Sequence, residues 1–111
     1  MCTSQGTATA TVQIENGRVK VTEWRFAARG DNTGWHRHDH DYVVVPLFDG
    51  TLEIDLGGGE RVQAILRKGI PYFRGFGAEH DVINANDFDC AFIEIELLEP
   101  APLRPAPAPS S

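Results

Sequence analysis

Apolar and polar residues alternate in short runs along most of the chain, which is the period of a β-strand whose two faces meet different surroundings. In the clearest run, Leu52 and Ile54 lie on the face opposite Glu53. No window combines a 3.6-residue period with helix caps. The pattern therefore predicts strands and no helices, over residues 12–15, 19–27, 36–48, 51–56, 61–67, 70–74, 80–83 and 88–98.

Turn signals separate these runs. Asn16-Gly17 and Asp49-Gly50 are hairpin-turn dipeptides, and three consecutive glycines at 57–59 turn the chain again. Short strands joined by such turns are typical of an antiparallel sandwich or barrel. A chain of 111 residues is long enough for one such domain with its own core.

The two ends of the chain differ in composition from the middle. Residues 1–11 are small and polar and offer little to bury, so we expect a flexible N-terminus. Residues 100–111 are rich in proline and alanine, a composition typical of an extended, disordered tail. The folded domain is therefore predicted over residues 12–99.

Composition narrows the classes of function. Apolar residues make up 41% of the chain and charged residues 23%, the mix of an ordinary globular domain. The net charge of −6 argues against nucleic-acid and anionic-membrane partners, which need basic patches. Residues 1–5 do not look like a signal peptide, and Cys2 and Cys90 are interpreted as free thiols of a reducing compartment. We therefore expect a protein of the cytoplasm.

Three of the four histidines, His36, His38 and His40, lie within five residues at the start of a predicted strand. Side chains two apart in a strand share a face, so these three would project to one side. Imidazoles on one face can hold a divalent metal, each through one neutral nitrogen. His80 is distant in sequence, but a barrel can bring it close as a further ligand. The histidines therefore predict a metal site.

Two spaced motifs surround these histidines. The first begins at Gly30, continues after five intervening residues with His36-x-His38, and ends at Gly50. The second consists of Gly69, Gly77, His80 and Asn84, with Gly75 where proline is usual. In order and separation the pair resembles the two motifs of the cupin superfamily, and together they cover roughly residues 30–84. The amino-acid sequence around these motifs is similar to that of the BauB group (β-alanine degradation protein) of small single-domain cupins.

The resemblance implies an all-β fold, a single-domain conical β-barrel of the double-stranded β-helix or jelly-roll type. It implies a divalent metal inside the barrel, held by His36, His38 and His80. It also implies pairing of two copies as a homodimer.

The chain departs from the first motif at its acidic ligand, which falls on Tyr42 or Val43. Unbroken alternation from His38 would turn Tyr42 inward, whereas a bulge would put Val43 there and leave an open coordination position. A three-histidine set suits iron, nickel, zinc, manganese or copper better than magnesium or calcium. The thiol dioxygenases of the superfamily resemble this arrangement, with three histidines and iron.

Several other side chains have both a functional and an ordinary interpretation. His40 is an alternate ligand, or a residue that faces solvent or orients a ligand. Tyr42 is a candidate for proton transfer and substrate binding, or a half-buried core residue. Arg74 is a candidate for binding a carboxylate, or a surface charge. Cys90 is interpreted as a buried small hydrophobe.

The acidic residues near the motifs receive no functional role from the sequence alone. Asp39, Asp41 and Asp81 alternate out of phase with the histidines and are interpreted as solvated surface. The last predicted strand places Glu94 and Glu96 opposite its isoleucines, and alternation alone leaves open which face turns inward.

Two hypotheses from different classes follow. In the first, the protein is a metal-dependent enzyme of the dioxygenase or isomerase type that acts on a small anionic or carbonyl-bearing metabolite. In the second, it is a module that binds a small molecule or a metal without turnover, which the absent acidic ligand favours. Oxygen uptake by iron-loaded protein would separate the two.

Overall fold

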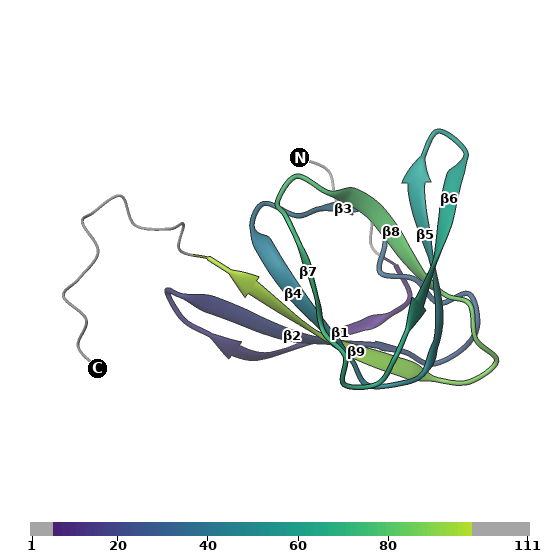
Figure 1. Cartoon of the computed structure of the whole chain (residues 1–111), viewed down its shortest axis with the longest axis horizontal. Helices are drawn as coiled ribbons and strands as arrows, with labels where there is room; N and C mark the ends of the chain where they lie inside the picture. Colours follow the sequence, from purple (N-terminus) through teal and green to yellow (C-terminus); the bar gives the residue numbers. More distant parts are fainter. Residues whose placement is uncertain (1–5, 99–111) are drawn as a thin grey trace.

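The computed structural model describes residues 6–98, and these form nine strands and no helix, so no helix among them could cross a membrane (Figure 1). The strands are β1 (Thr9–Glu15), β2 (Val19–Phe26), β3 (His36–Arg37), β4 (Asp41–Pro46), β5 (Gly50–Gly57), β6 (Glu60–Leu66), β7 (Tyr72–Arg74), β8 (Glu79–Asn84) and β9 (Cys90–Leu97).

All the strand pairs are antiparallel, and they make two sheets. The larger sheet has the order β1-β2-β9-β4-β7 and the smaller β3-β8-β5-β6. The chain changes sheet between β2 and β3, and again between β3 and β4, so the two sheets enclose a common interior (Figure 1). This architecture confirms the prediction of an all-β barrel.

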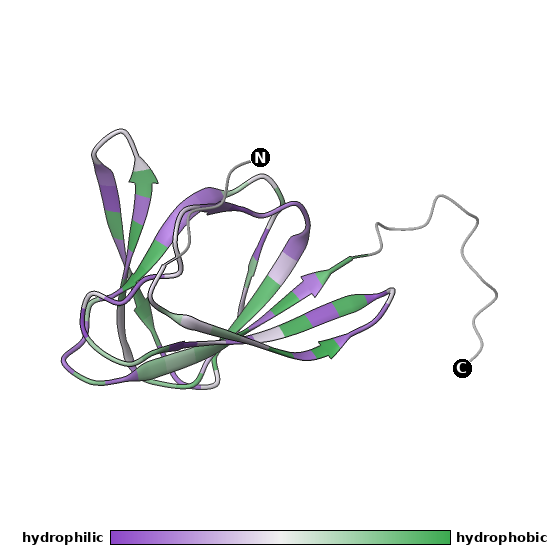
Figure 2. Cartoon of the chain, turned by 180° about the vertical axis from the view of Figure 1, so that it is seen from behind, coloured by the Kyte–Doolittle hydropathy of each residue, from purple (hydrophilic) through white to green (hydrophobic). Residues whose placement is uncertain are grey.

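The core lies where the inward faces of the two sheets meet. It includes Phe26 and Leu52, which are at most 1% exposed, together with Phe92 and Val82. Hydrophobic and hydrophilic residues alternate along several strands, as the sequence pattern predicted (Figure 2). Cys90 is a free, buried thiol beside this core, and burial raises its pKa to about 11, so it is not poised as a nucleophile.

The prediction of one strand over 36–48 is wrong. β3 ends at Arg37 and pairs with β8 in the smaller sheet, whereas β4 begins at Asp41 and pairs with β9 and β7 in the larger one. Residues 38–40 carry the chain from one sheet to the other and belong to neither. Alternation persists on both sides of this crossing, so the sequence pattern alone did not reveal the break.

The first strand begins earlier than predicted. β1 starts at Thr9 and not at Val12, since Thr9 already pairs with Arg25 of β2. Backbone pairing along β2 extends the strand through residues whose side chains bury nothing. The prolines and alanines of 100–111, predicted to be a disordered tail, and Cys2 lie outside the described residues.

Two buried asparagines close the end of the barrel away from the histidines. The Asn84 side chain is 1% exposed, and its amide donates to the carbonyl oxygens of Ala28 and Phe88 at 3.1 and 3.0 Å. Its oxygen accepts from the backbone and side-chain amides of Asn86 at 2.9 and 2.8 Å. The side chain thus joins the loop after β2 to the loop between β8 and β9.

Replacement of Asn84 by alanine is expected to lower the free energy of unfolding by about 2–3 kcal/mol, because it leaves several buried polar groups without partners. The matched control is Asn16→Ala, since the Asn16 oxygen accepts two turn amides at an exposed site. Its loss is expected to stay below about 1 kcal/mol. Urea unfolding of both variants measures the difference, and equal losses would contradict this role for Asn84.

Candidate metal centre

Antiparallel pairing of β3 with β8 puts His36 directly opposite His80. The Nε2 atom of His38 lies 3.0 Å from Nε2 of His36 and 3.1 Å from Nε2 of His80. The rings of the three histidines meet edge to face, at interplanar angles of 75–80°. Three imidazole nitrogens that converge in this way form a donor set for one metal ion.

His38 reaches this cluster from a loop and not from a strand. Its backbone amide donates to the Ala78 carbonyl at 2.8 Å, and its carbonyl accepts from the amide of Gly77 at 2.7 Å. Gly77 has a φ of 95°, a conformation that favours glycine. The loop before β8 therefore fixes the second histidine, which explains why glycine at this position of the motif matters to the site.

His36 is oriented by its second ring nitrogen. Its Nδ1 lies 2.7 Å from the Gly34 carbonyl oxygen, which can only accept a hydrogen bond, so Nδ1 carries the proton. Nε2 is then the nitrogen with the free lone pair, and it faces His38. Trp24 stacks on the same ring at a centroid distance of 6.4 Å and an angle of 14°. These contacts thus hold the ring with Nε2 directed toward the other two histidines.

The interpretation of Asp81 as solvated surface is wrong. This half-buried carboxylate accepts hydrogen bonds from the Asn32 side chain at 2.8 Å and from the Gly34 amide at 3.0 Å. It therefore anchors the loop whose carbonyl orients His36. Asp39 does lie at the surface, where it pairs with Arg37 at 3.5 Å, and Asp41 accepts from the Phe76 amide.

Burial keeps two of the three imidazoles neutral. Desolvation, with a smaller effect of His36 and His80, lowers the pKa of His38 to about 3. Desolvation and His36 lower the pKa of His80 to about 4. Neutral imidazole is the form that binds a metal, so both rings are in the right state at neutral pH. His40, the alternate ligand of the sequence analysis, is not part of this cluster.

Tyr42, and not Val43, turns inward at the position of the missing acidic ligand. It is 3% exposed, and its ring stacks on His38 at a centroid distance of 3.9 Å. Burial, followed by the charge of Glu94, raises the pKa of its hydroxyl. Tyr42 therefore stays protonated near neutral pH, with its hydroxyl proton available to a hydrogen-bond acceptor.

Glu94 of β9 is the inward carboxylate that the sequence analysis left unassigned. It is 8% exposed, and a carboxylate oxygen lies within 4.8 Å of a ring nitrogen of His38. Desolvation, and then the charge of Glu96, raises its pKa to about 7. It takes part in no hydrogen bond or ion pair with the rest of residues 6–98. The strand register pairs it with Val44, so it shares the inner face with Phe92.

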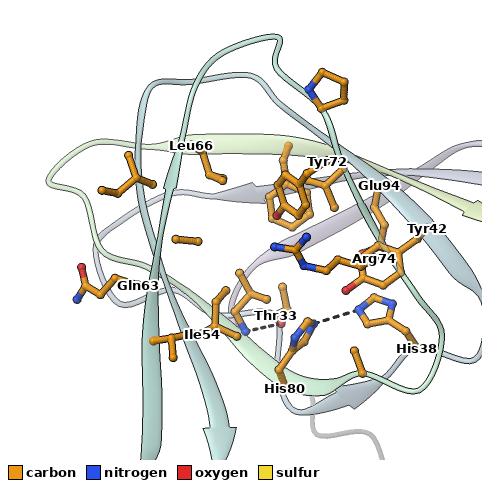
Figure 3. A pocket seen from close by; sticks show the side chains of 18 of the residues that line it. Thr33, His38, Tyr42, Ile54, Gln63, Leu66, Tyr72, Arg74, His80 and Glu94 are labelled. Atoms are coloured by element: carbon orange, nitrogen blue, oxygen red, sulfur yellow. Dashed lines mark hydrogen bonds between the residues drawn. The ribbon is translucent and has the colours of Figure 1, made fainter.

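Arg74 of β7 contributes the positive charge of the site. It is paired across the sheet with Tyr42, and its guanidinium lies 4.5 Å above the ring of Tyr72. One nitrogen donates to the Phe73 carbonyl at 2.9 Å, and no carboxylate of the described residues pairs with it. Figure 3 shows the guanidinium directed into the pocket, on the side of His38 and His80.

The three histidines lie on the wall of a cavity of about 610 Å³ that opens to solvent. Tyr42, Arg74 and Glu94 share its polar end with them, while side chains of β5 and β6 form an apolar wall (Figure 3). Cavities of this size bind small organic molecules in other proteins. The site therefore combines a metal donor set, a cation without a carboxylate partner among the described residues and a carboxyl group with a raised pKa in one cavity.

The chain is 54% identical over 90 residues to the β-alanine degradation protein BauB of Pseudomonas aeruginosa, which covers 81% of this chain and 93% of that protein. A crystal structure of a cupin domain from Bordetella pertussis superposes with a TM-score of 0.77, at 49% identity, over 84% of this chain and 95% of that one. The protein is a small cupin of the BauB group. Searches of family models gave no match to this cupin.

A more distant structure, with a double-stranded β-helix domain from Klebsiella pneumoniae, matches this cupin at 22% identity and a TM-score of 0.66, over 85% of this chain and 79% of that one. It shows the fold alone. The arrangement of His36, His38 and His80 fits the metal-binding chemistry predicted from the two motifs, because their donor atoms converge and burial keeps His38 and His80 neutral.

Proposed function

We propose that this cupin binds one divalent transition metal through His36, His38 and His80, and that a small metabolite reaches the metal through the cavity. The observation that carries the proposal is the convergence of the three Nε2 atoms, 3.0 and 3.1 Å apart. A set of three imidazoles suits iron, nickel, zinc, manganese or copper. A bound ion would supply Lewis acidity or, if it is iron, dioxygen chemistry.

The side chains around the metal centre support an enzyme of the dioxygenase or isomerase type. Arg74 would bind a carboxylate of the substrate, since its own charge has no carboxylate partner among the described residues. Tyr42 would donate a hydrogen bond to a substrate oxygen next to the metal. Glu94 would accept or release a proton, because its pKa of about 7 allows both forms near neutral pH.

The relative named for β-alanine degradation suggests the catabolism of a small amino acid or aldehyde as the setting. We propose the cytoplasm as the compartment, where the free thiol of Cys90 would stay reduced. We also propose a homodimer, because β1 is exposed along its whole length and carries Val12 and Ile14 there, 47% and 51% exposed.

The alternative proposal is a binding module without turnover. It is favoured by Tyr42, which stands in place of the acidic ligand and cannot ionise near neutral pH. The metal content of the protein is the first test of both proposals. Protein purified without a histidine tag, and reconstituted with Fe²⁺, Ni²⁺, Zn²⁺, Mn²⁺ and Cu²⁺ in turn, is expected to hold one equivalent of metal by mass spectrometry.

Turnover of a substrate is the second test, and it separates the enzyme from the binding module. Oxygen uptake by the iron-loaded protein in the presence of small carboxylates and dicarbonyls would support the enzyme, and tight binding without consumption would support the module. Failure of every metal to bind would end both forms of the proposal.

A further inference from the structure

The cavity has two chemically different ends. The histidines, Tyr42, Arg74 and Glu94 are at one end. At the other, the inward faces of β5 and β6 supply an almost entirely apolar wall. The cross-strand pairs Ile54–Val62 and Leu52–Ala64 set this face, and Val82 and Phe92 continue it. Figure 3 shows Ile54 and Leu66 across the pocket from Arg74.

The volume of the cavity exceeds what a small metabolite needs. A three-carbon amino acid has six non-hydrogen atoms, and at roughly 30 Å³ for each, the share of a water molecule in the liquid, it would fill less than a third of the 610 Å³. The remaining space would hold water against aliphatic side chains, where water has few polar partners. A ligand with an apolar body fits this space better.

The polar groups at the other end select the head of such a ligand. The guanidinium of Arg74 has no carboxylate partner among residues 6–98, and the hydroxyls of Tyr42 and Tyr72 make no hydrogen bond there either. All three line the cavity. One cation without a carboxylate partner and two hydroxyl groups without hydrogen bonds, as found among these described residues, are complementary to a carboxylate.

We propose that the natural ligand of this cupin is a carboxylate with a hydrocarbon chain of about six to ten carbons. Its head group binds at Arg74 and the metal centre, and its chain lies along β5 and β6. The inference rests on the proposed function only for the contact of the head group with the metal. It names a larger and more apolar ligand than the amino acid in the relative's name.

Chain length is the first test. Calorimetric titration of the Zn²⁺-loaded protein at pH 6.0 with propanoate, hexanoate and octanoate is expected to show affinity that rises up to about fourfold for each buried methylene. The low pH limits repulsion by Glu94, which lies close to His38. Equal affinities along the series, with one equivalent of zinc bound, would overturn the inference and leave the proposed function standing.

Narrowing the apolar end is the second test. Ala64→Phe is expected to weaken octanoate binding at least tenfold while leaving propanoate affinity and zinc content unchanged, because Ala64 lines the cavity on the β6 wall. The matched control, Ala27→Phe, adds the same ring at an exposed site outside the cavity and should change none of the three. Val62→Phe repeats the test if Ala64→Phe melts early.

The outcomes separate the two proposals. Octanoate affinity that is insensitive to Ala64→Phe and Val62→Phe would mean binding elsewhere on the surface and would overturn the inference. Failure of the protein to bind zinc or any of the other four metals would overturn the proposed function. The same titrations of metal-free protein would then test the inference with Arg74 as the only binding group for the carboxylate. In that protein, Arg74→Met is expected to abolish the higher affinity of octanoate over propanoate, because the head group is no longer anchored.

Discussion

The substitution His80→Ala is expected to lower the affinity of the protein for Zn²⁺ by at least ~100-fold. The loss of a residue that merely orients a metal ligand already lowers metal affinity about 10–100-fold. His80 supplies one of only three donor nitrogens in the cluster, and no carboxylate among the described residues lies close enough to all the remaining histidines to replace it. Competition titration with a chromogenic chelator measures the change.

The control for this variant is His40→Ala, which removes the fourth histidine of the sequence without touching the cluster. Its Zn²⁺ affinity is expected to match the wild type, and a loss equal to that of His80→Ala would restore His40 as a ligand. Far-UV circular dichroism and the melting temperature of metal-free His80→Ala should be close to those of the wild type, because the barrel core does not include the histidines. Unfolding of this variant together with unfolding of the metal-free wild type would make the metal structural.

The second large effect concerns Glu94 and the pH dependence of stability. The pKa of Glu94 rises from 4.5 to about 7 on folding, so the folded protein binds more protons than the unfolded chain between these values. Stability is therefore lost as the pH rises through this window. Glu94→Gln cannot ionise, and in metal-free protein it is expected to be more stable than the wild type by about 3 kcal/mol above pH 8.

The difference should shrink toward zero as the pH falls below 4.5, because Glu94 then becomes protonated in both the folded and the unfolded state. His38 and His80 contribute an opposite slope, since their lowered pKa values cost stability as the pH falls below 6.5, but they do so in both proteins. Urea unfolding in chelator at pH 5.0, 6.5 and 8.5 gives the difference. A constant difference over this range would mean that Glu94 is not buried in its charged form.

The strands and the metal ligands were accessible from the sequence, but the partners of the ligands were not. Alternation located β5 and β6 to within one residue at most ends, because one of their faces packs in the interior. The spacing of the two motifs selected His36, His38 and His80 without any knowledge of the pairing of β3 with β8. Local pattern was enough where one face of a strand is buried.

Glu94 shows where the pattern failed. β9 alternates acidic and apolar residues, and the ordinary rule would send Ile93 and Ile95 inward. The structure does the reverse, because a barrel that encloses a polar site turns its carboxylates in and leaves both isoleucines half-buried on the outer face. The role of Asp81 was not predicted for a similar reason. Its partners Asn32 and Gly34 lie in a loop, and the alternation of a strand does not describe the path of a loop.

The hydrogen bond from His36 to the Gly34 carbonyl has a consequence for competition between metal ions and protons. The imidazole of His36 is held in the tautomer that presents Nε2, and His38 and His80 resist protonation down to about pH 4. A metal that enters the site at neutral pH therefore displaces no proton from these two rings. Mild acidification to a pH unit or more below neutrality would therefore leave His38 and His80 in the form that binds a metal, whereas it would protonate exposed histidines.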